Sequence, residues 1–366
     1  MQRTFRSSAA SWREMNAHVH SKEAEGLGYL LDKRYLLHNP DKQHPESPQR
    51  LIAIQQMLDA ADLEDHFERL HPRVATADEL ALIHSHSHIL RVEEAAKRAP
   101  AYLDMDTPVS SDSYQTALLA AGGVLRCVDA VCSENLRRVF AFVRPPGHHA
   151  DRERASGFCL FNNVAVAAAY ALKEHKLQRV AIVDMDVHHG NGTQSCFYSN
   201  PRVLYISTHQ YPFYPGSGSF NEVGRGEGRG YTLNFPLPEG AGDSTFVPIY
   251  SKIVSAVLDQ FLPQLILVST GLDGHYKDPV GGLSLTPAGY ASAAGSLMLS
   301  ADRHCGGNIC FVLEGGYDLQ ALKDCSSAIL AEMKKQPPDE LSVRESSLFK
   351  QISRQAAKYS AGIWKW

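Results

Sequence analysis

The feature that most constrains this 366-residue chain is a short apolar run, residues 180–183, that leads directly into carboxylates and imidazoles. Apolar runs of this length, bounded by turn residues, are typical of strands buried on both faces of a parallel sheet. The residues that follow, Asp184, Asp186 and His188, occupy alternate positions and therefore share one face of an extended chain. Because such groups are costly to desolvate together without a cation, the run predicts a cation site; the alternative is a solvated acidic loop.

Strand-like and helical patterns alternate along the rest of the chain. Apolar runs typical of strands lie at 26–38 (a first strand and its exit), 138–143, 203–208, 231–237, 265–269 and 309–313, and helical patterns at 112–133, 163–173, 193–198, 244–262 and 287–303. This alternation predicts an α/β fold, with a parallel sheet covered by helices on both faces. We expect one domain over residues 26–366, preceded by an N-terminal extension, residues 1–25.

Local signals add three smaller expectations. Ser47 is placed to cap a helix that has Pro48 in its first turn. His84, His86 and His88 invite a metal interpretation, but helical spacing would splay them, so we expect structural or surface roles. The C-terminal tail, with Trp364 and Trp366, is expected to be exposed.

Composition excludes several classes of protein. The formal net charge of -4 argues against binding to nucleic acid by bulk electrostatics, and we find no apolar segment long enough to cross a membrane. Seven scattered cysteines, an odd number without CxxC spacing, indicate a reducing compartment, so we expect a cytoplasmic protein. The Arg-containing first fifteen residues weakly resemble an organellar presequence, but a plain extension or arm is the preferred interpretation. The oligomeric state stays open.

Four predicted strands end in polar clusters that are far apart in the sequence. These clusters are His148 and His149; Asp184, Asp186 and His188; Asp273; and Tyr317. Since parallel strands bring their carboxyl ends to one edge of a sheet, the four clusters are expected to form one pocket. A long Gly-rich loop, residues 211–230, with aromatic residues at Tyr211, Phe213 and Tyr214, is a further candidate for function.

The residue types in this pocket predict metal-assisted hydrolysis. Asp186, His188 and Asp273 could bind Zn²⁺ and leave a position for water, although Fe²⁺ or Mn²⁺ also suits this oxygen-rich set. His148 and His149 can supply the base and the acid that hydrolysis needs. Asp184 and Asn191 are available to orient them, and an Asp partner favours a charged imidazole whereas an Asn partner leaves it closer to neutral. Tyr317 can donate to an oxyanion, so amide or ester hydrolysis is expected.

At this point the chain resembles a known family, the zinc-dependent histone deacetylase superfamily, and within it the class II and bacterial deacetylase-like amidohydrolases. The resemblance rests on residues 144–149, 157–163, 184–194 and 313–317, which occur in the family's order, and it covers roughly residues 28–335. It implies the arginase/deacetylase fold, a single domain with an eight-stranded parallel sheet. It also implies removal of acyl groups from acyl-lysine or related acyl-amides.

The resemblance also assigns roles to individual residues. It implies zinc on Asp186, His188 and Asp273, His149 as general base and acid, and His148 as its electrostatic partner held by Asp184. Tyr317 would polarise the acyl carbonyl. The residues expected to contact the substrate are Gly157, Phe158, Tyr214, Leu283 and Gly316, with Leu283 near the tunnel rim and Tyr214 where the family usually has Phe.

Two potassium sites and a product cavity are implied in the same way. The inner potassium site would use Asp184, Asp186, His188, Ser207 and Thr208, and the second Phe197, Asn200, Val203 and Tyr231. Arg50 matches an arginine near the acetate-release cavity. The departures from the family pattern, in residues 269–275 and in Asn191 where class I enzymes have Asp, touch no expected zinc ligand.

Three rival functions remain open. A binuclear manganese ureohydrolase would need further carboxylates where this chain has Gly190 and His275. A polyamine deacetylase would place an acidic residue after Asp278 and Pro279, where this chain has Val280. The third rival is a non-catalytic acyl or metal sensor.

Overall fold

A computed structural model describes residues 26–39, 43–61, 63, 66–336, 338, 343–360 and 362–366. Eight strands form one sheet in which every pairing is parallel, in the order β2-β1-β5-β10-β9-β6-β7-β8. The strands are β1 (Leu27–Leu30), β2 (Glu68–Leu70), β5 (Arg138–Ala141), β6 (Val180–Asp184), β7 (Val203–Gln210), β8 (Thr232–Leu237), β9 (Leu265–Thr270) and β10 (Ile309–Leu313). The predicted single-domain α/β fold with an eight-stranded parallel sheet is thereby confirmed. The extension over residues 1–25 lies outside the described residues.

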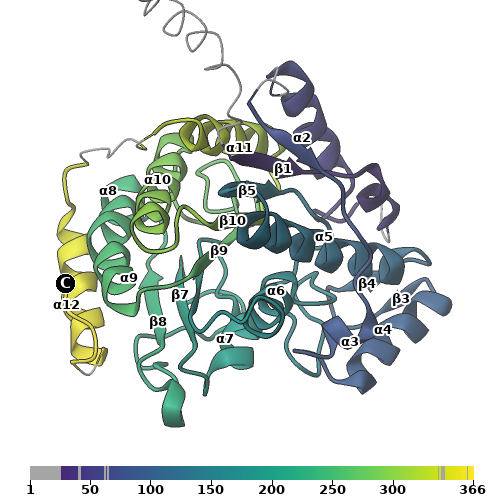
Figure 1. The fold of residues 1–366 in the computed structure, drawn as a ribbon, viewed down its shortest axis with the longest axis horizontal. Coiled ribbons are helices and arrows are strands. Elements are labelled where there is room, and N and C mark those ends of the chain that lie inside the picture. Colours follow the sequence, from purple (N-terminus) through teal and green to yellow (C-terminus); the bar gives the residue numbers. More distant parts are fainter. Residues whose placement is uncertain are drawn as a thin grey trace, which may run out of the picture.

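Helices cover both faces of this sheet (Figure 1). One face carries α5 (Ser113–Ser133), α6 (Asn163–Lys173) and α7 (Asn191–Phe197). The other carries α2 (Gln49–Ala60), α8 (Asp243–Pro248), α9 (Ser255–Phe261), α10 (Pro287–His304), α11 (Leu319–Met333) and α12 (Ser347–Tyr359), with a π-helix, η4 (Ile249–Val254), between α8 and α9. Two short helices, α3 (Ala77–Leu80) and α4 (His86–Lys97), accompany a small antiparallel hairpin, β3 (Ala101–Tyr102) and β4 (Pro108–Val109).

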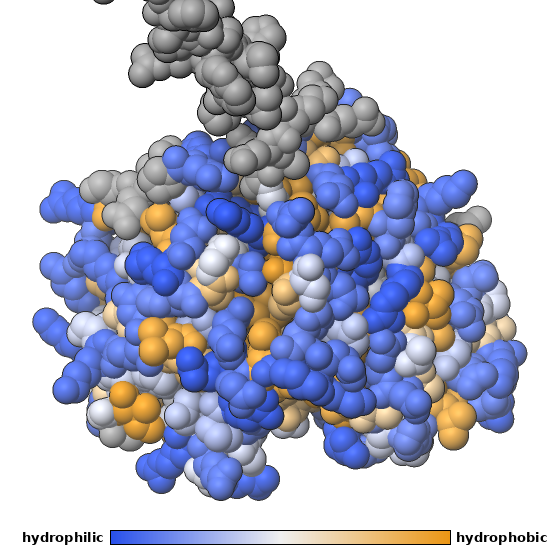
Figure 2. Space-filling view, viewed as in Figure 1, coloured by the Kyte–Doolittle hydropathy of each residue, from blue (hydrophilic) through white to orange (hydrophobic). Residues whose placement is uncertain are grey.

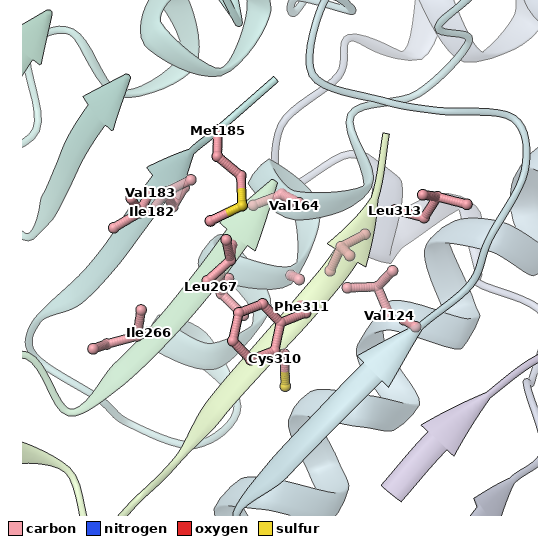
Figure 3. Packing of buried hydrophobic residues seen from close by; sticks show 14 of the residues in the cluster. Val124, Val164, Ile182, Val183, Met185, Ile266, Leu267, Cys310, Phe311 and Leu313 are labelled. Carbon is pink, nitrogen blue, oxygen red and sulfur yellow. The ribbon is translucent and has the colours of Figure 1, made fainter. Parts of the chain in front are cut away.

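The core lies between the sheet and its two helical layers. All residues of β6, β7, β9 and β10 are buried, as expected for strands covered on both faces. Figure 3 shows side chains of the central strands, such as Ile182 and Phe311, packed together with Val124 of α5 and Val164 of α6. The view in Figure 2 is mainly hydrophilic, with apolar residues scattered over it.

The sheet order explains how distant residues meet. The four strands that end in predicted polar clusters, β5, β10, β9 and β6, are consecutive neighbours in the sheet. Their carboxyl ends therefore lie side by side at one edge, although the four strands are spread over residues 138–313 of the sequence. The predicted common pocket rests on this arrangement.

Several local expectations need correction. Pro48, not Ser47, is the N-cap residue of α2, and no side chain caps this end, since Ser47 contributes only its carbonyl to Arg50 N. Trp364 is not exposed: its ring packs edge-on against Tyr231, and its indole nitrogen donates to the carbonyl of Gly230. An apolar ring with one donor is stabilised by such a buried site, a contact that sequence position alone does not reveal.

Other details refine the picture. Helix α5 is long and apolar enough to cross a membrane by length and composition, contrary to expectation, but 78% of its most apolar window is buried inside the protein.

Edge strand β2 was not predicted, because two of its three residues are exposed and it has no apolar run. The structural role expected for the histidines is confirmed, since His84 and His88 are buried and bonded to backbone groups while His86 is exposed.

Candidate metal centre and active site

A buried cluster of Asp186, His188 and Asp273 lies where β6 and β9 end. His188 Nδ1 is 3.0 Å from Asp186 Oδ1 and 3.4 Å from Asp273 Oδ2. Each residue offers one ligand atom, these atoms lie within 4.8 Å of one another, and all three residues are buried. No other group of this kind was found among the described residues.

The cluster fits a cation on its own chemistry. Asp273 Oδ2 is buried without a hydrogen-bond partner in the described part of the chain, which is costly for a carboxylate oxygen unless a cation approaches it. Burial and the neighbouring Asp186 carboxylate raise the pKa of Asp273. Burial lowers the pKa of His188, but its contacts with Asp186 and Asp273 outweigh this and raise it to about 9. The donor set of two oxygens and one nitrogen suits Zn²⁺ with an open position, and also Fe²⁺ or Mn²⁺.

Two adjacent histidines follow β5 and face the cluster. The rings of His148 and His149 are 4.0 Å apart, and the His149 ring lies 5.8 Å from that of His188. His148 Nδ1 is 3.1 Å from Asp184 Oδ2, and His149 Nδ1 is 2.7 Å from Asn191 Oδ1. The structure therefore places Asp184 and Asn191 beside the two imidazoles, one partner each.

The pKa values of the two imidazoles are shifted in opposite directions. Burial disfavours the charged form of both. For His148 the carboxylates of Asp186 and Asp184 outweigh burial and raise the pKa to about 10. For His149 burial, together with the positive charges of His148 and His188, lowers the pKa well below its ordinary value. The two shifts therefore favour the charged form of His148 and the neutral form of His149.

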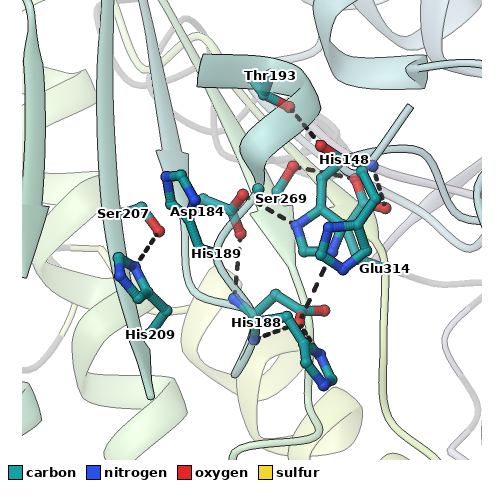
Figure 4. A network of polar contacts seen from close by, with 12 residues as sticks. His148, Asp184, His188, His189, Thr193, Ser207, His209, Ser269 and Glu314 are labelled. Carbon is teal, nitrogen blue, oxygen red and sulfur yellow. Dashed lines mark hydrogen bonds and ion pairs between the residues drawn. The ribbon is translucent and has the colours of Figure 1, made fainter. Parts of the chain in front are cut away.

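A buried carboxylate fixes the loop that carries the histidines. Glu314, at the end of β10, accepts hydrogen bonds from the backbone nitrogens of Gly147 and His148 at 2.6 and 3.2 Å. Its other oxygen accepts from Ser269 Oγ of β9 at 3.0 Å, so one side chain ties together the ends of three strands (Figure 4). Glu314 was not predicted as a site residue, because its backbone partners and Ser269 meet it only in the folded sheet.

A cavity of about 250 Å³ opens onto these groups. It is lined by Asp106, Pro146, His148, His149, Gly157, Phe158, Cys159, His188, Phe213, Tyr214, Val280, Gly315 and Tyr317. The Tyr214 ring meets His149 edge-on at 5.0 Å, and the Phe158 ring meets Tyr317 edge-on at 5.9 Å. The predicted tunnel aromatics therefore both lie in the wall, with the metal cluster and the histidines beside them.

Gly157 lies in the cavity wall, at a position where a larger residue would not fit. Its φ is +54°, a left-handed conformation, and a Cβ would lie 2.3 Å from His149 Cδ2. Phe213, which the sequence analysis noted only as a loop aromatic, stacks on His188 with ring centroids 5.3 Å apart and an interplanar angle of 17°. Asp106 was also missed as a lining residue, and no short-range pattern signals it.

Two predicted substrate contacts lie elsewhere. Leu283 does not line the cavity: its side chain is 4% exposed and belongs to the hydrophobic core, while Val280 lies at the wall. Gly316 is likewise absent from the lining, and its neighbour Gly315 lies there instead. The carbonyl of Gly316 accepts a hydrogen bond from Arg50 Nε at 2.7 Å.

Tyr317 is held from two sides. Its backbone nitrogen donates to Asp278 Oδ2 at 2.6 Å, and the guanidinium of Arg50 lies 4.9 Å from the centre of its ring. Arg50 is fully buried and also donates to Glu46 of the same region at 3.1 Å. The phenol can therefore face the cavity in a fixed position.

The residues expected at potassium sites lie close to β6 and β7. Thr208 Oγ1 donates to the carbonyl of Asp184 at 3.5 Å, and Ser207 pairs with Asp184 in the sheet. In the second set, Phe197 and Asn200 accept backbone hydrogen bonds in the turn before β7, and Tyr231 accepts one from Tyr205. These contacts leave potassium binding at both sites a prediction.

Comparison with known proteins places these features in a family. Residues 44–333 match the histone deacetylase domain. The chain is 39% identical over 309 residues to a probable deacetylase of Archaeoglobus fulgidus, covering 84% of this chain and 86% of that protein. It is 40% identical over 302 residues to histone deacetylase 10, chloroplastic, of Oryza sativa subsp. japonica, covering 78% and 68%.

A solved structure agrees. The crystal structure of the HDA15 HD domain superposes with a TM-score of 0.85 at 35% identity, covering 92% of this chain and 95% of that one. The predicted arginase/deacetylase fold and the predicted family are both confirmed. The chain belongs to the histone deacetylase family and is a hydrolase of the deacetylase type.

Proposed function

We propose that this protein is a zinc-dependent deacetylase that hydrolyses the amide of acyl-lysine or of related acyl-amides. The observation that carries the proposal is the buried Asp186–His188–Asp273 cluster, whose Asp273 Oδ2 has no hydrogen-bond partner among the described residues. Beside it lie two histidines whose pKa values are shifted in opposite directions. Asp186, His188 and Asp273 would hold the zinc. When bound, zinc would supply Lewis acidity that makes water nucleophilic near neutral pH.

The protein's own groups divide the proton transfers between them. His149, kept neutral, can take a proton from water at its free Nε2, because its Nδ1 is engaged by Asn191. It can then return this proton to the leaving amine. His148, whose charged form is favoured by the carboxylates of Asp186 and Asp184, stabilises negative charge that develops nearby. Tyr317 donates its hydroxyl hydrogen to the acyl oxygen.

The cavity supports a linear acyl-amine as substrate. Phe158 and Tyr214 provide aromatic walls suited to a flexible alkyl chain, while the polar groups lie together beside them. Val280 lies in the lining, where a polyamine deacetylase would need an acid to attract a second ammonium. We therefore favour acyl-lysine in a peptide or protein over acetylpolyamines.

The test is a comparison of kcat/KM for an acetyl-lysine peptide and for acetylspermidine with zinc-loaded protein. We expect the peptide to be the better substrate. A strong preference for acetylspermidine would reject the acyl-lysine assignment and support the polyamine alternative. An absence of turnover on both substrates would support the sensor alternative.

Three further assignments are part of the proposal. The two potassium sites are proposed on the residues described above, with structural roles. The seven cysteines are all free, which supports the proposed reducing, cytoplasmic location. Gly190 and His275 leave no carboxylates for a second metal, which supports a mononuclear centre over a ureohydrolase.

A further inference from the structure

The loop after β7 supplies one wall of the cavity and needs a separate support. Phe213 stacks on His188, and Tyr214 meets His149 edge-on, yet Tyr214 is 40% exposed. Residues 211–230 contain only one short 3-10 helix, η3 (Gly226–Gly228). A loop of this kind keeps two rings in place only if other contacts restrain its backbone.

Glu222 supplies such contacts from within the loop. Its Oε1 accepts hydrogen bonds from the backbone nitrogens of Gly218 and Ser219 at 2.8 and 2.9 Å. Its Oε2 accepts from Gln194 Nε2 of helix α7 at 2.7 Å. One carboxylate thus closes the segment 218–222 on itself and ties it to a helix packed on the sheet. Bonds to a charged acceptor are stronger than neutral ones.

The order of donors and acceptors behind Glu222 is fixed. Because an ionised carboxylate only accepts, the Gln194 amide nitrogen must face it. The Gln194 oxygen then accepts from His189 Nε2 at 3.0 Å and from Asn234 Nδ2 at 2.7 Å. With its hydrogen on Nε2, His189 uses Nδ1 to accept from Ser217 Oγ at 2.8 Å. The network returns to the loop three residues after Tyr214.

The loop also packs tightly on two buried imidazoles. His209 Nε2 donates to the carbonyl of Gly218 at 2.8 Å, and the rings of His189 and His209 are 4.8 Å apart (Figure 4). Gly218 has a φ of +95°, and a Cβ there would lie 2.3 Å from His209 Nε2. The anchored segment therefore has little freedom to shift, and His189 directly follows the candidate metal ligand His188.

We propose that Glu222 is a positioning residue for substrate specificity: by anchoring residues 217–222 through Gln194 and His189, it holds Phe213 and Tyr214 as the wall that grips the substrate's alkyl chain. This rests on the proposed function. Glu222 lies outside the cavity lining, so it acts through the rings and not on the reacting atoms. Loosening it should weaken binding of a long chain and leave the chemistry of a bound substrate intact.

The test uses Glu222→Gln and its polarity swap. In the Glu222→Gln variant, the new amide nitrogen faces the Gln194 amide nitrogen. Both groups are donors, so the hydrogen bond between these two side chains is lost. In the double variant Gln194→Glu/Glu222→Gln the new carboxylate accepts from residue 222 and still accepts from His189 and Asn234, so the pattern is restored. Glu227→Gln, an exposed change in the same loop, is the matched control.

The measurements are calorimetric Kd values of zinc-loaded protein for octanohydroxamic acid and acetohydroxamic acid, with KM and kcat for an acetyl-lysine peptide. We expect Glu222→Gln to weaken octanohydroxamate binding and raise KM about fivefold to twentyfold, from one buried mismatch. Acetohydroxamate binding and kcat should stay within about twofold, since the short ligand barely reaches the wall. The double variant should recover most of the loss, and the control should match wild type.

Other outcomes separate the two proposals. Equal weakening of both hydroxamates, unchanged octanohydroxamate binding, or a double variant no better than Glu222→Gln would overturn the positioning role. Wild-type protein that binds both hydroxamates but turns over no acetyl-lysine peptide would contradict the proposed function instead. The binding comparison would then still decide the role of Glu222.

Discussion

At the scale of single residues, the site depends on a difference between two neighbouring histidines. His148 has a carboxylate on its Nδ1, and His149 has an amide oxygen. Burial disfavours the charged form of both rings, but the carboxylates of Asp186 and Asp184 raise the pKa of His148, while the charges of His148 and His188 lower that of His149 further. The proposed division of roles between these two histidines therefore depends on residues elsewhere in the sequence.

Replacement of Asn191 by Asp tests this division. A carboxylate in place of the Asn191 oxygen, which lies 2.7 Å from His149 Nδ1, should stabilise the imidazolium and raise the pKa of His149. A base must be neutral to accept a proton, so the acidic limb of the kcat/KM profile should move to higher pH. Asn135→Asp, an exposed change of the same type, is the control. An unshifted profile would contradict the role of His149 as the base.

Replacement of Tyr317 by Phe removes only the hydroxyl. Since Asp278 holds the backbone and Arg50 packs on the ring, the fold and the cavity should persist. Loss of one donor to a developing oxyanion costs about 10²–10³ in kcat. Steady-state rates on an acetyl-lysine peptide measure the loss, with Tyr276→Phe, at a largely exposed tyrosine, as control. An unchanged kcat would refute the oxyanion role.

At the scale of elements, the sequence predicts what local patterns encode. The apolar runs that precede Asp184, Asp273 and Tyr317 identify buried strands, and the parallel arrangement of these strands brings their carboxyl ends together. Strand β2 and the helix cap at Pro48 could not be predicted, because neither carries a distinctive pattern. Glu314 and Phe213 were missed as site residues because their roles depend on partners that only the folded sheet supplies.

The burial of Trp364 in the C-terminal segment could not be predicted from the sequence either. The Trp364→Ala variant tests how much this segment contributes to stability. Trp364 packs against Phe261 of α9 as well as Tyr231, and it donates to Gly230. Loss of a buried large aromatic ring costs about 3–5 kcal/mol of unfolding free energy. Urea denaturation measures this cost, with Leu262→Ala, at a half-exposed residue, as control. Equal stability of the two variants would show that the tail is not part of the folded core.

At the scale of the whole molecule, metal binding and stability should be linked through pH. Burial raises the pKa of Asp273 above its ordinary value and that of Glu314 to about 7. A carboxyl whose pKa is raised by folding keeps a proton that the unfolded chain releases from about pH 4 upward. Stability of the metal-free protein therefore falls as pH rises through this window. Zinc held by Asp273, as proposed, would need the ionised carboxylate, so zinc binding should strengthen over the same range.

The difference in Tm between zinc-loaded and chelated protein should widen as pH rises from about 5.5 to 8. At a pH where free zinc is about 100 times its Kd, zinc binding adds about 2.7 kcal/mol to the free energy of unfolding. Thermal unfolding at several pH values measures the difference, and Asp273→Asn, which removes the linked carboxyl, should largely abolish it. A difference that stays constant or narrows with rising pH would argue against zinc binding at Asp273.

The most direct test of the whole account is the metal stoichiometry of activity. Chelated protein is titrated with zinc while hydrolysis of an acetyl-lysine peptide is followed. The account predicts that activity is absent without metal and reaches its plateau at one zinc per chain, and that the Asp186→Asn variant shows no recovery at the same stoichiometry. Full activity in the metal-free protein, or a plateau only at two metal ions per chain, would contradict a mononuclear deacetylase centred on Asp186, His188 and Asp273.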